Sequence, residues 1–419
     1  MDAHALAQRA RHLMPWGTQT NAKRPVDALA GDMPLFFDRA DGCRLRTPDG
    51  DWFIDYRSAL GPILLGYRHP EVEAAVRAQM DRGVLFSMAS PIELEVAERL
   101  VRAVPTLEQV HFMKTGNDAN SATVRLARAF TGRDHLVSTG YHGYSDWFAC
   151  GTGAQAAVVT SEVTGVPTAL DALVTRVGYG DTAALERVFE ERGHEIAAFI
   201  TVPYDWGEHV AAGFLERARE LTEQHGSLLL FDEVLTGFRL AVGGAAEYFG
   251  VVPDLAAFAK GLANGYPLSA YGGRRDVMEM LYRVTLTTTY AGETLSLAAA
   301  AATLDVLHRE PVIEHIWQMG QRLRDGFDAA AQRHGLDARA IGLPPAVQFR
   351  FSADPAADAR AQTVFDRELY RRGIFASRPF LLAYAHQPAD IDETIEAMDA
   401  ALAVVADEFA TVQTTPFHP

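Results

Sequence analysis

Two apolar runs of the sequence end in side chains that could do chemistry together. Residues 228–231 are followed by Asp232, and residues 255–259 are followed by Lys260. A lysine held at the end of a buried strand is partly desolvated, which lowers its pKa and frees the amine for Schiff-base chemistry. A plain salt bridge would explain the same pattern. The pair is also what pyridoxal phosphate requires, because a lysine binds its aldehyde and an aspartate keeps its pyridine nitrogen protonated.

Lysine is scarce in this chain. Lys23, Lys114 and Lys260 are the three lysines among 38 basic residues, and the rest are arginines. A coding bias toward arginine explains most of this scarcity. Because arginine supplies the surface charge, a lysine in an apolar setting invites a chemical explanation.

Two further requirements of this cofactor can be sought in the sequence. Its phosphate needs a helix N-terminus with small residues, since free N–H groups and the helix dipole favour an anion. A strand at 110–113 leads into Gly116 and Asn117, where a helix is predicted to begin. The ring needs an aromatic partner, and Tyr141 follows a short strand predicted at 136–138. An ordinary capped helix and a packed tyrosine would produce the same patterns.

Taken in chain order, these motifs resemble those of the class III pyridoxal-phosphate aminotransferases, on the branch of glutamate-1-semialdehyde aminomutase. The resemblance runs from about residue 15 to residue 393. It is carried by six segments: GPILLGYRHP at 61–70, TGNDA at 115–119 with RLAR and TGR after it, YHG at 141–143, DEVLTGFR at 232–239, AKG at 259–261 and TYAGET at 289–294. Each segment alone is weakly specific, whereas six in the correct order are specific.

The resemblance implies an α/β chain of fold type I, with a mostly parallel seven-stranded sheet, in a homodimer whose active sites are shared at the subunit interface. It assigns Lys260 to the Schiff base and to proton transfer, and Asp232 to the pyridine nitrogen. Tyr141 and Val234 would lie on opposite faces of the ring. The remaining cofactor contacts that it implies are His142 in the tyrosine motif and the phosphate-binding residues Gly116, Asn117 and Thr289, the last from the segment that reaches the neighbouring subunit.

The sequence departs from the family pattern at three places. Val202 stands where the family usually has a glutamate before a proline, and Asn117-Asp118 stands where Ser/Thr-Glu is commoner. In the aminomutases an N-terminal arginine holds the substrate carboxylate, and the nearest counterpart here is Lys23 or Arg24. The first and third departures favour a different reaction from that of the aminomutase.

We therefore expect a transaminase with a ping-pong cycle, in which Lys260 acts as general acid and base. An amino-acid donor would give its nitrogen to an aldehyde or ketone acceptor, such as a carbonyl of a sugar or another specialised metabolite. Arginine suits the donor carboxylate, with Arg378 as the first candidate and Arg239 and Arg24 next, although each could form a structural salt bridge instead. The alternatives are intramolecular amino transfer, as in the aminomutase, and a non-catalytic descendant of the family.

The elements that would position these residues follow from the apolar pattern. From about residue 61 to residue 305, short apolar runs alternate with amphipathic stretches such as 214–225, which predicts strands and helices of an α/β domain. We expect residues 1–60 to form an N-terminal arm with a small β segment. Residues 61–305 would form the large cofactor-binding domain, and residues 306–419 a smaller C-terminal domain.

Composition narrows the classes of partner. The 419 residues carry a net charge of −16, which repels phosphate backbones and anionic lipid, so we expect neither nucleic-acid nor membrane binding. The expected substrates are the small-molecule amino donor and carbonyl acceptor of the proposed reaction. Cys43 and Cys150 make no disulfide framework and suit a reducing cytoplasm. The first 17 residues lack the apolar core of a secretory signal, and the apolar stretch 295–307 is shorter than the about 20 residues of a membrane span.

Two other enzyme classes find little support in the sequence. The fragment Gly151-Thr152-Gly153 lacks the third glycine of a dinucleotide-binding turn. Histidines at helical i, i+4 spacing and paired cysteines do not occur, so no metal site is predicted. His142 and His386 are expected to be hydrogen-bonded parts of the scaffold.

Overall fold

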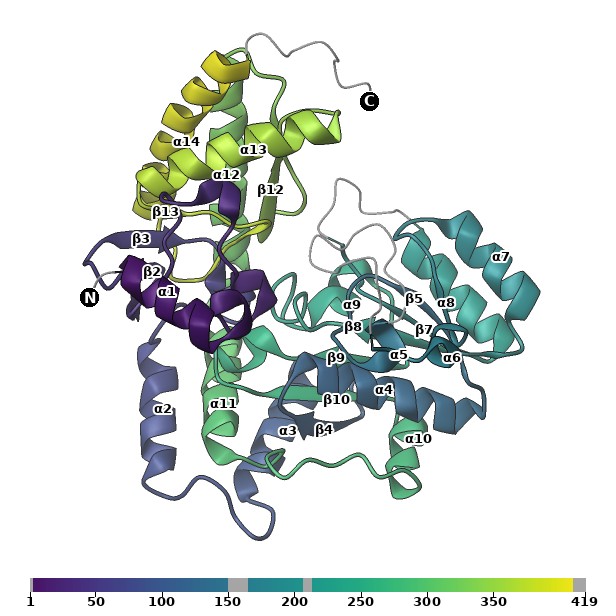
Figure 1. The fold of residues 1–419 in the computed structure, drawn as a ribbon. Coiled ribbons are helices and arrows are strands. Elements are labelled where there is room, and N and C mark those ends of the chain that lie inside the picture. The colour runs from purple at the N-terminus through teal and green to yellow at the C-terminus, as the bar shows by residue number, and fades with distance from the viewer. Residues whose placement is uncertain (1–2, 150–164, 206–212, 410–419) are drawn as a thin grey trace.

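The computed structural model describes residues 3–149, 165–205 and 213–409 (Figure 1). Its centre is a sheet of seven strands in the order β4-β10-β9-β8-β7-β5-β6. Strand β10 runs antiparallel to both of its neighbours, and the other pairs are parallel. The predicted mostly parallel seven-stranded sheet is therefore confirmed. Its strands are β4 (Gln109–Met113), β5 (His135–Thr139), β6 (Val174–Arg176), β7 (Ile196–Thr201), β8 (Leu228–Asp232), β9 (Leu255–Phe258) and β10 (Ser269–Gly273).

Both faces of this sheet are covered, because its central strands are apolar on both sides. In β8, Leu228 and Leu230 pack into one buried cluster, whereas Leu229 and Phe231 pack into another on the opposite face. The first cluster includes residues of α4 (Gly116–Thr131) and α10 (Arg275–Met278). The second includes residues of α7 (Thr182–Arg192) and α8 (Phe214–His225). This arrangement leaves the carboxyl edge of the sheet for a ligand.

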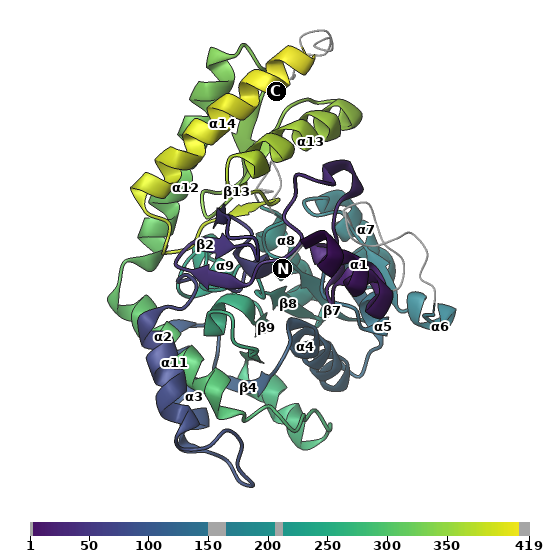
Figure 2. The same cartoon turned by 60° about the vertical axis from the view of Figure 1, so that its left-hand side comes forward.

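The C-terminal part of the chain is built from three long helices and a small sheet. Figures 1 and 2 show α12 (Val312–Arg333), α13 (Pro355–Arg371) and α14 (Pro388–Phe409) gathered at one end of the molecule. Beside them lies an antiparallel sheet in the order β11-β12-β14. Its strands are β11 (Arg339–Ile341), β12 (Ala346–Arg350) and β14 (Phe380–Leu381).

The N-terminal segment joins this C-terminal part through a four-stranded sheet in the order β1-β2-β3-β13. Its strands are β1 (Arg39–Asp41), β2 (Arg44–Arg46), β3 (Trp52–Asp55) and β13 (Ile374–Phe375). Strand β13 pairs in parallel with β3, with Ile374 opposite Ile54. The division at residues 60 and 305 stays a prediction, and this pairing supports grouping the first and third segments in one small domain.

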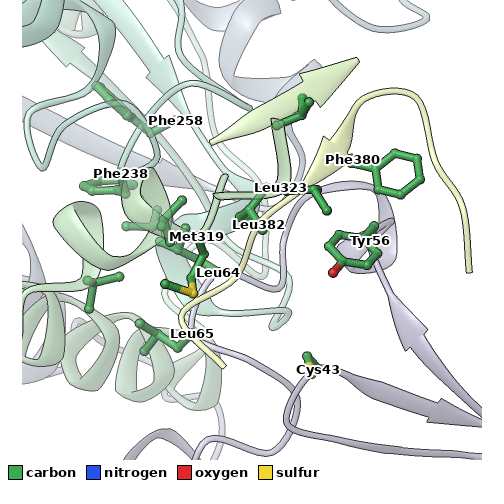
Figure 3. Packing of buried hydrophobic residues seen from close by; sticks show 14 of the residues in the cluster. Cys43, Tyr56, Leu64, Leu65, Phe238, Phe258, Met319, Leu323, Phe380 and Leu382 are labelled. Carbon is green, nitrogen blue, oxygen red and sulfur yellow. The ribbon is translucent and has the colours of Figure 1, made fainter. Parts of the chain in front are cut away.

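One buried cluster links the small and large parts of the molecule (Figure 3). Tyr56 from the segment after β3 lies in it with Leu64 and Phe258, and Met319 of α12 and Leu382 after β14 belong to the same cluster. The large part of the molecule is thus packed against the small part through a shared core.

The remaining helices and short turns complete the described chain. Among the described residues, no helix has the length and apolar character that a membrane span requires, and no group of three His, Cys, Asp or Glu side chains is placed to hold a metal. Cys150 and the fragment at 151–153 lie outside the described residues. The remaining helices are α1 (Ala3–Leu13), α2 (Pro70–Met80), α3 (Pro91–Ala103), α5 (Asp146–Ala149), α6 (Thr168–Asp171), α9 (Gly244–Phe249) and α11 (Thr294–Arg309). The short 3-10 turns are η1 (Pro15–Gly17), η2 (Asn21–Lys23), η3 (Asp27–Leu29), η4 (Ser58–Leu60), η5 (Lys260–Ala263) and η6 (Glu279–Tyr282).

Candidate active site

Lys260 and Asp232 lie at the ends of two adjacent parallel strands. Asp232 is the last residue of β8 and is opposite Ala257 of β9, and Lys260 begins the turn η5 just after β9. Lys260 has a backbone φ of 41°, in the left-handed region that non-glycine residues rarely adopt. Such strain is concentrated at functional sites.

The electrostatic surroundings of Lys260 favour a neutral amine more than water does. Its pKa is lowered to about 8, mainly because burial desolvates the ammonium and in part because the positive charge of Arg239 is close. The negative charge of Asp232 acts in the opposite direction. An amine with this pKa is partly unprotonated at neutral pH, as a nucleophile and proton carrier must be.

Asp232 is buried and held by three donors. Its Oδ2 lies 2.8 Å from Nδ2 of Asn120 and 2.8 Å from Nδ1 of His142, and its Oδ1 accepts a 3.0 Å hydrogen bond from the amide of Val234. Asn120 also donates to the carbonyl of His142 at 3.1 Å. Sequence reasoning missed Asn120. The signal that could have found it is a polar residue on the buried, alanine-rich face of α4.

His142 has acceptors at both ring nitrogens. Nε2 lies 3.0 Å from the backbone carbonyl of Thr139, which can only accept, so Nε2 carries a hydrogen. Nδ1 faces the carboxylate of Asp232, so a proton also lies between these two groups. His142 is therefore a structural partner of Asp232, as expected of a scaffold histidine, and it places a proton next to the carboxylate.

The N-terminus of α4 has the form of an anion site. Thr115 caps the helix by accepting from the amide of Asp118, while the amides of Gly116 and Asn117 have no partner within the helix. A Cβ on Gly116 would lie 2.8 Å from both methyl carbons of Val234, so only glycine leaves room there. Val234 thus lies directly beside the predicted phosphate cup.

The side chain of Asn117 fixes the loop that carries Tyr141. Its Oδ1 accepts from the amides of Tyr144 and Ser145 at 2.9 and 3.0 Å. The ring of Tyr141 is 59% exposed and meets Phe148 edge-on at 5.6 Å, so one face is free to stack on a ligand. These residues, with Lys260 and Asp232, fit pyridoxal phosphate. They offer an amine, an acid, an aromatic face and free helix amides.

Val202, the residue in place of the family's acid, lies next to this loop. Its amide donates to the carbonyl of Thr139 at 3.3 Å, and a Cβ on Gly140 would lie 2.2 Å from its Cγ2. The departure from the family pattern therefore borders Gly140, the residue before Tyr141.

The residues predicted to bind a substrate carboxylate differ in burial and in the groups they contact. Arg239 is 1% exposed and donates to two backbone carbonyls, whereas the Arg378 side chain is 49% exposed and pairs with Asp366 at 3.1 Å. Arg24 is exposed after η2, and Lys23 lines a largely apolar cavity of about 330 Å³ in the N-terminal arm. Among the described residues, none of the four forms a hydrogen bond with Lys260, and Arg239 acts on it through its charge.

Comparison with known proteins agrees with the geometry. The family model described as "Aminotransferase class-III" matches residues 26–402. This chain belongs to the class III aminotransferases. The enzyme is therefore a pyridoxal-phosphate-dependent protein of fold type I, as the sequence motifs predicted.

Relatives of this class III aminotransferase carry several names. A protein of Thermomicrobium roseum named glutamate-1-semialdehyde 2,1-aminomutase is 37% identical, over 96% of this chain and 98% of its own. The internal aldimine form of the FumI protein of Sphingopyxis sp. MTA144 is 32% identical with a TM-score of 0.90, covering 98% of both chains. An omega-transaminase of Sphaerobacter thermophilus is 27% identical with a TM-score of 0.87, covering 96% of this chain and 98% of that one.

Proposed function

We propose that this aminotransferase moves an amino group to or from a carbonyl carbon, with Lys260 as the reacting amine. The observation that carries the proposal is a lysine with a pKa of about 8 beside a buried aspartate that is bound by His142 and Asn120. Pyridoxal phosphate, when bound, supplies an electron-withdrawing ring that makes a proton on the substrate carbon removable.

Each side chain of the site has a defined task in this proposal. Lys260 takes the proton from the substrate carbon at its Nζ and returns it to the carbon that is to be protonated. Asp232 would hold the pyridine nitrogen of the bound cofactor through a proton, and His142 keeps the carboxylate oriented. Tyr141 and Val234 would confine the ring, while Gly116 and Asn117 would bind the phosphate through their amides.

Two versions of the reaction are supported by different observations. The names of the curated relatives favour transfer within one molecule, because proteins 34–37% identical over at least 94% of this chain are named glutamate-1-semialdehyde 2,1-aminomutase. The site favours transfer between two molecules. Val202 stands beside the Tyr141 loop where the family usually has a glutamate, and the nearest counterpart of the aminomutase's N-terminal arginine is Lys23 or Arg24. The second version would accept an amino-acid donor and an aldehyde or ketone.

Of the predicted carboxylate-reading residues, we propose Arg378 and Lys23 as the ones in a position to act. Arg378 has a half-exposed guanidinium on the small part of the molecule, and Lys23 lines the cavity of the N-terminal arm together with Arg57 and Trp16. Arg24 is the next candidate; it is exposed like Lys23 but is not among the residues that line this cavity. A planar guanidinium would bind a carboxylate with two hydrogen bonds, whereas Lys23 would act as a point charge.

We also propose that two copies of the chain share their active sites. Thr289 lies on an exposed turn before α11. This position supports the expectation that it serves a second subunit. Sedimentation velocity of the purified protein would show a dimer, and a monomer with full activity would contradict this assignment.

Isotope transfer separates the two versions of the reaction. Glutamate-1-semialdehyde is supplied alone in one experiment, and a panel of nitrogen-15 amino acids is supplied with aldehyde and ketone acceptors in another. Isomerisation without a second substrate supports the aminomutase version, and nitrogen-15 in an acceptor supports the transaminase version. If neither occurs with the cofactor bound, the proposed function is wrong.

A further inference from the structure

Arg239 is a buried cation without an acidic partner. Its guanidinium donates from Nη1 to the carbonyl of Leu382 at 2.7 Å and from Nη2 to the carbonyl of Gly61 at 3.1 Å. Among the described residues no carboxylate forms a salt bridge with it, although Arg239 is 1% exposed, and burial alone lowers its pKa. A buried charge normally has a counter-ion, because desolvation is costly. Such an arrangement therefore calls for a reason other than stability.

One of the two carbonyls that bind Arg239 belongs to a residue beside the stem of Lys260. A Cβ on Gly61 would lie 3.4 Å from Cδ of Lys260 and 3.6 Å from Cδ1 of Leu381. Gly61 is therefore adjacent to the lysine stem and to the strand-end segment at 381–382, and its carbonyl accepts from the guanidinium. In Figure 3, Leu382 belongs to the same buried cluster as Phe238, the residue before Arg239.

The segment that Arg239 holds is strained. Ser58, Ala59 and Leu60 have φ values of 48°, 53° and 75°, and Gly61 follows at 104°. Three successive non-glycine residues in the left-handed region persist only where surrounding contacts enforce them. The contact from Arg239 to Gly61 is one of these restraints. A second comes from Asp55, which accepts from the amide of Ser58 at 3.1 Å.

The charged groups that face Lys260 are few. Asp232 at the end of β8 favours the ammonium form, and Arg239 in the loop after β8 disfavours it. The segment at Gly61 and the end of β14 contribute glycine and leucine at this point, without charge. Like charges at short range in an apolar interior repel more strongly than in water. Arg239 keeps its own proton at neutral pH, since burial lowers its pKa only to about 10.

We propose that Arg239 is a positioning residue for Lys260: it holds the strained segment at Gly61 against the lysine stem and sets a fixed positive charge behind the amine. The inference rests on the proposed function in one respect, namely that Lys260 is the reacting amine. It assigns Arg239 a role different from binding the donor carboxylate.

The scarcity of lysine makes a direct test practical. The full-length protein, stripped of pyridoxal phosphate with hydroxylamine, is labelled with a trace of acetic anhydride between pH 6 and pH 11, and peptides are quantified by mass spectrometry. Lys23 and Lys114 serve as internal controls in every sample. The variants are Arg239→Gln, which removes the charge, and Arg239→Lys, which keeps it.

We expect Lys260 to titrate near pH 8 in the unmodified chain and higher by on the order of one pH unit in Arg239→Gln. Arg239→Lys should restore most of the low value, and Lys23 and Lys114 should not change. The proposal would be overturned if the pH midpoint of Lys260 labelling were the same in the wild-type chain and in a folded Arg239→Gln variant. A midpoint near 10 in the wild-type chain would also overturn it, a result that needs no variant to fold. Because the labelling requires no turnover, a chain that fails as an aminotransferase would still give an answer about Arg239.

Discussion

Nδ1 of His142 lies 2.8 Å from Oδ2 of Asp232, and Nε2 of the same ring lies 3.0 Å from the carbonyl of Thr139. Both groups are buried, so water cannot replace either hydrogen bond. The carboxylate therefore depends on this ring for its orientation.

Replacing His142 should weaken catalysis without unfolding the protein. We expect His142→Phe to lower kcat by about 10- to 100-fold, the size of effect seen when groups that orient a reactive ligand are removed. His135→Phe is a matched control. His135, on β5, is buried like His142, but its ring lies 2.8 Å from the hydroxyl of Thr175 and has no contact with Asp232. Steady-state rates for both variants would check this. Equal losses in the two variants would mean that packing, not the contact with Asp232, is responsible.

The charge of Asp232 should be measurable at Lys260. Asp232 raises the pKa of Lys260 relative to burial alone, so Asp232→Asn should lower the pH midpoint of amine labelling. The direction is opposite to that expected for Arg239→Gln. Amine labelling over a pH range, as described above, gives the measurement. A midpoint that rises in Asp232→Asn would contradict this electrostatic description of the site.

Gly61 should tolerate no side chain. An alanine there would have an unfavourable φ of 104° and a Cβ 2.4 Å from Cδ1 of Leu235, so Gly61→Ala should cost about 2 to 4 kcal/mol and displace Lys260. Gly50→Ala isolates the backbone effect, because Gly50 has a φ of 108° with no atom within 4 Å of the added carbon. Thermal unfolding and activity of both variants should differ. If Gly61→Ala lowers neither the unfolding temperature nor the activity more than Gly50→Ala does, crowding at Gly61 does not position Lys260.

Burial of Asp366, which its ion pair with Arg378 only partly offsets, should make stability depend on pH in a defined direction. Burial raises the pKa of Asp366 from 3.8 to about 6, so between these values the folded state binds more protons than the unfolded state. This residue therefore stabilises the fold at low pH, and its contribution falls by about 3 kcal/mol as pH rises through 6. Between pH 4 and pH 7, the unfolding free energy measured by denaturant titration should fall less in Asp366→Asn than in the wild-type chain.

Arg378→Gln tests whether this arginine also binds the donor. Removing the guanidinium leaves Asp366 without its counter-charge, so the loss of stability should grow above pH 6, where the carboxylate ionises. If Arg378 binds the donor carboxylate, KM for the donor should also rise at least tenfold. Unchanged KM with reduced stability would leave Arg378 a purely structural role and favour Lys23.

The chemical centre of the site could be predicted because it depends on strand ends. Asp232 and Lys260 each follow a short apolar run, and parallel strands bring such ends to one edge of the sheet. The start of the helix at Gly116 was similarly predicted from the glycine and the asparagine that follows it. Both inferences use local patterns, which a single sequence contains.

Other parts depend on contacts between distant segments and could not be predicted. Strand β10 ends in two glycines and has little β-branched character, so it was not among the predicted strands. Asn264 ties the distant segment at 64–66 to the lysine turn by accepting from the amides of Leu64 and Leu65 at 3.0 and 2.9 Å. Arg239 was visible as part of a motif, but its burial without an acid is a property of the folded chain.

The measurement that tests the central claim most directly is the visible absorption of the purified protein with pyridoxal phosphate, before and after amino donors are added. Lys260→Ala is compared with Lys23→Ala, so that loss of a lysine as such is controlled. We predict an absorption band near neutral pH that requires Lys260, persists in Lys23→Ala and is bleached by at least one amino donor. A band that survives in Lys260→Ala, or no band even with excess cofactor, would contradict the assignment of Lys260 as the reacting amine.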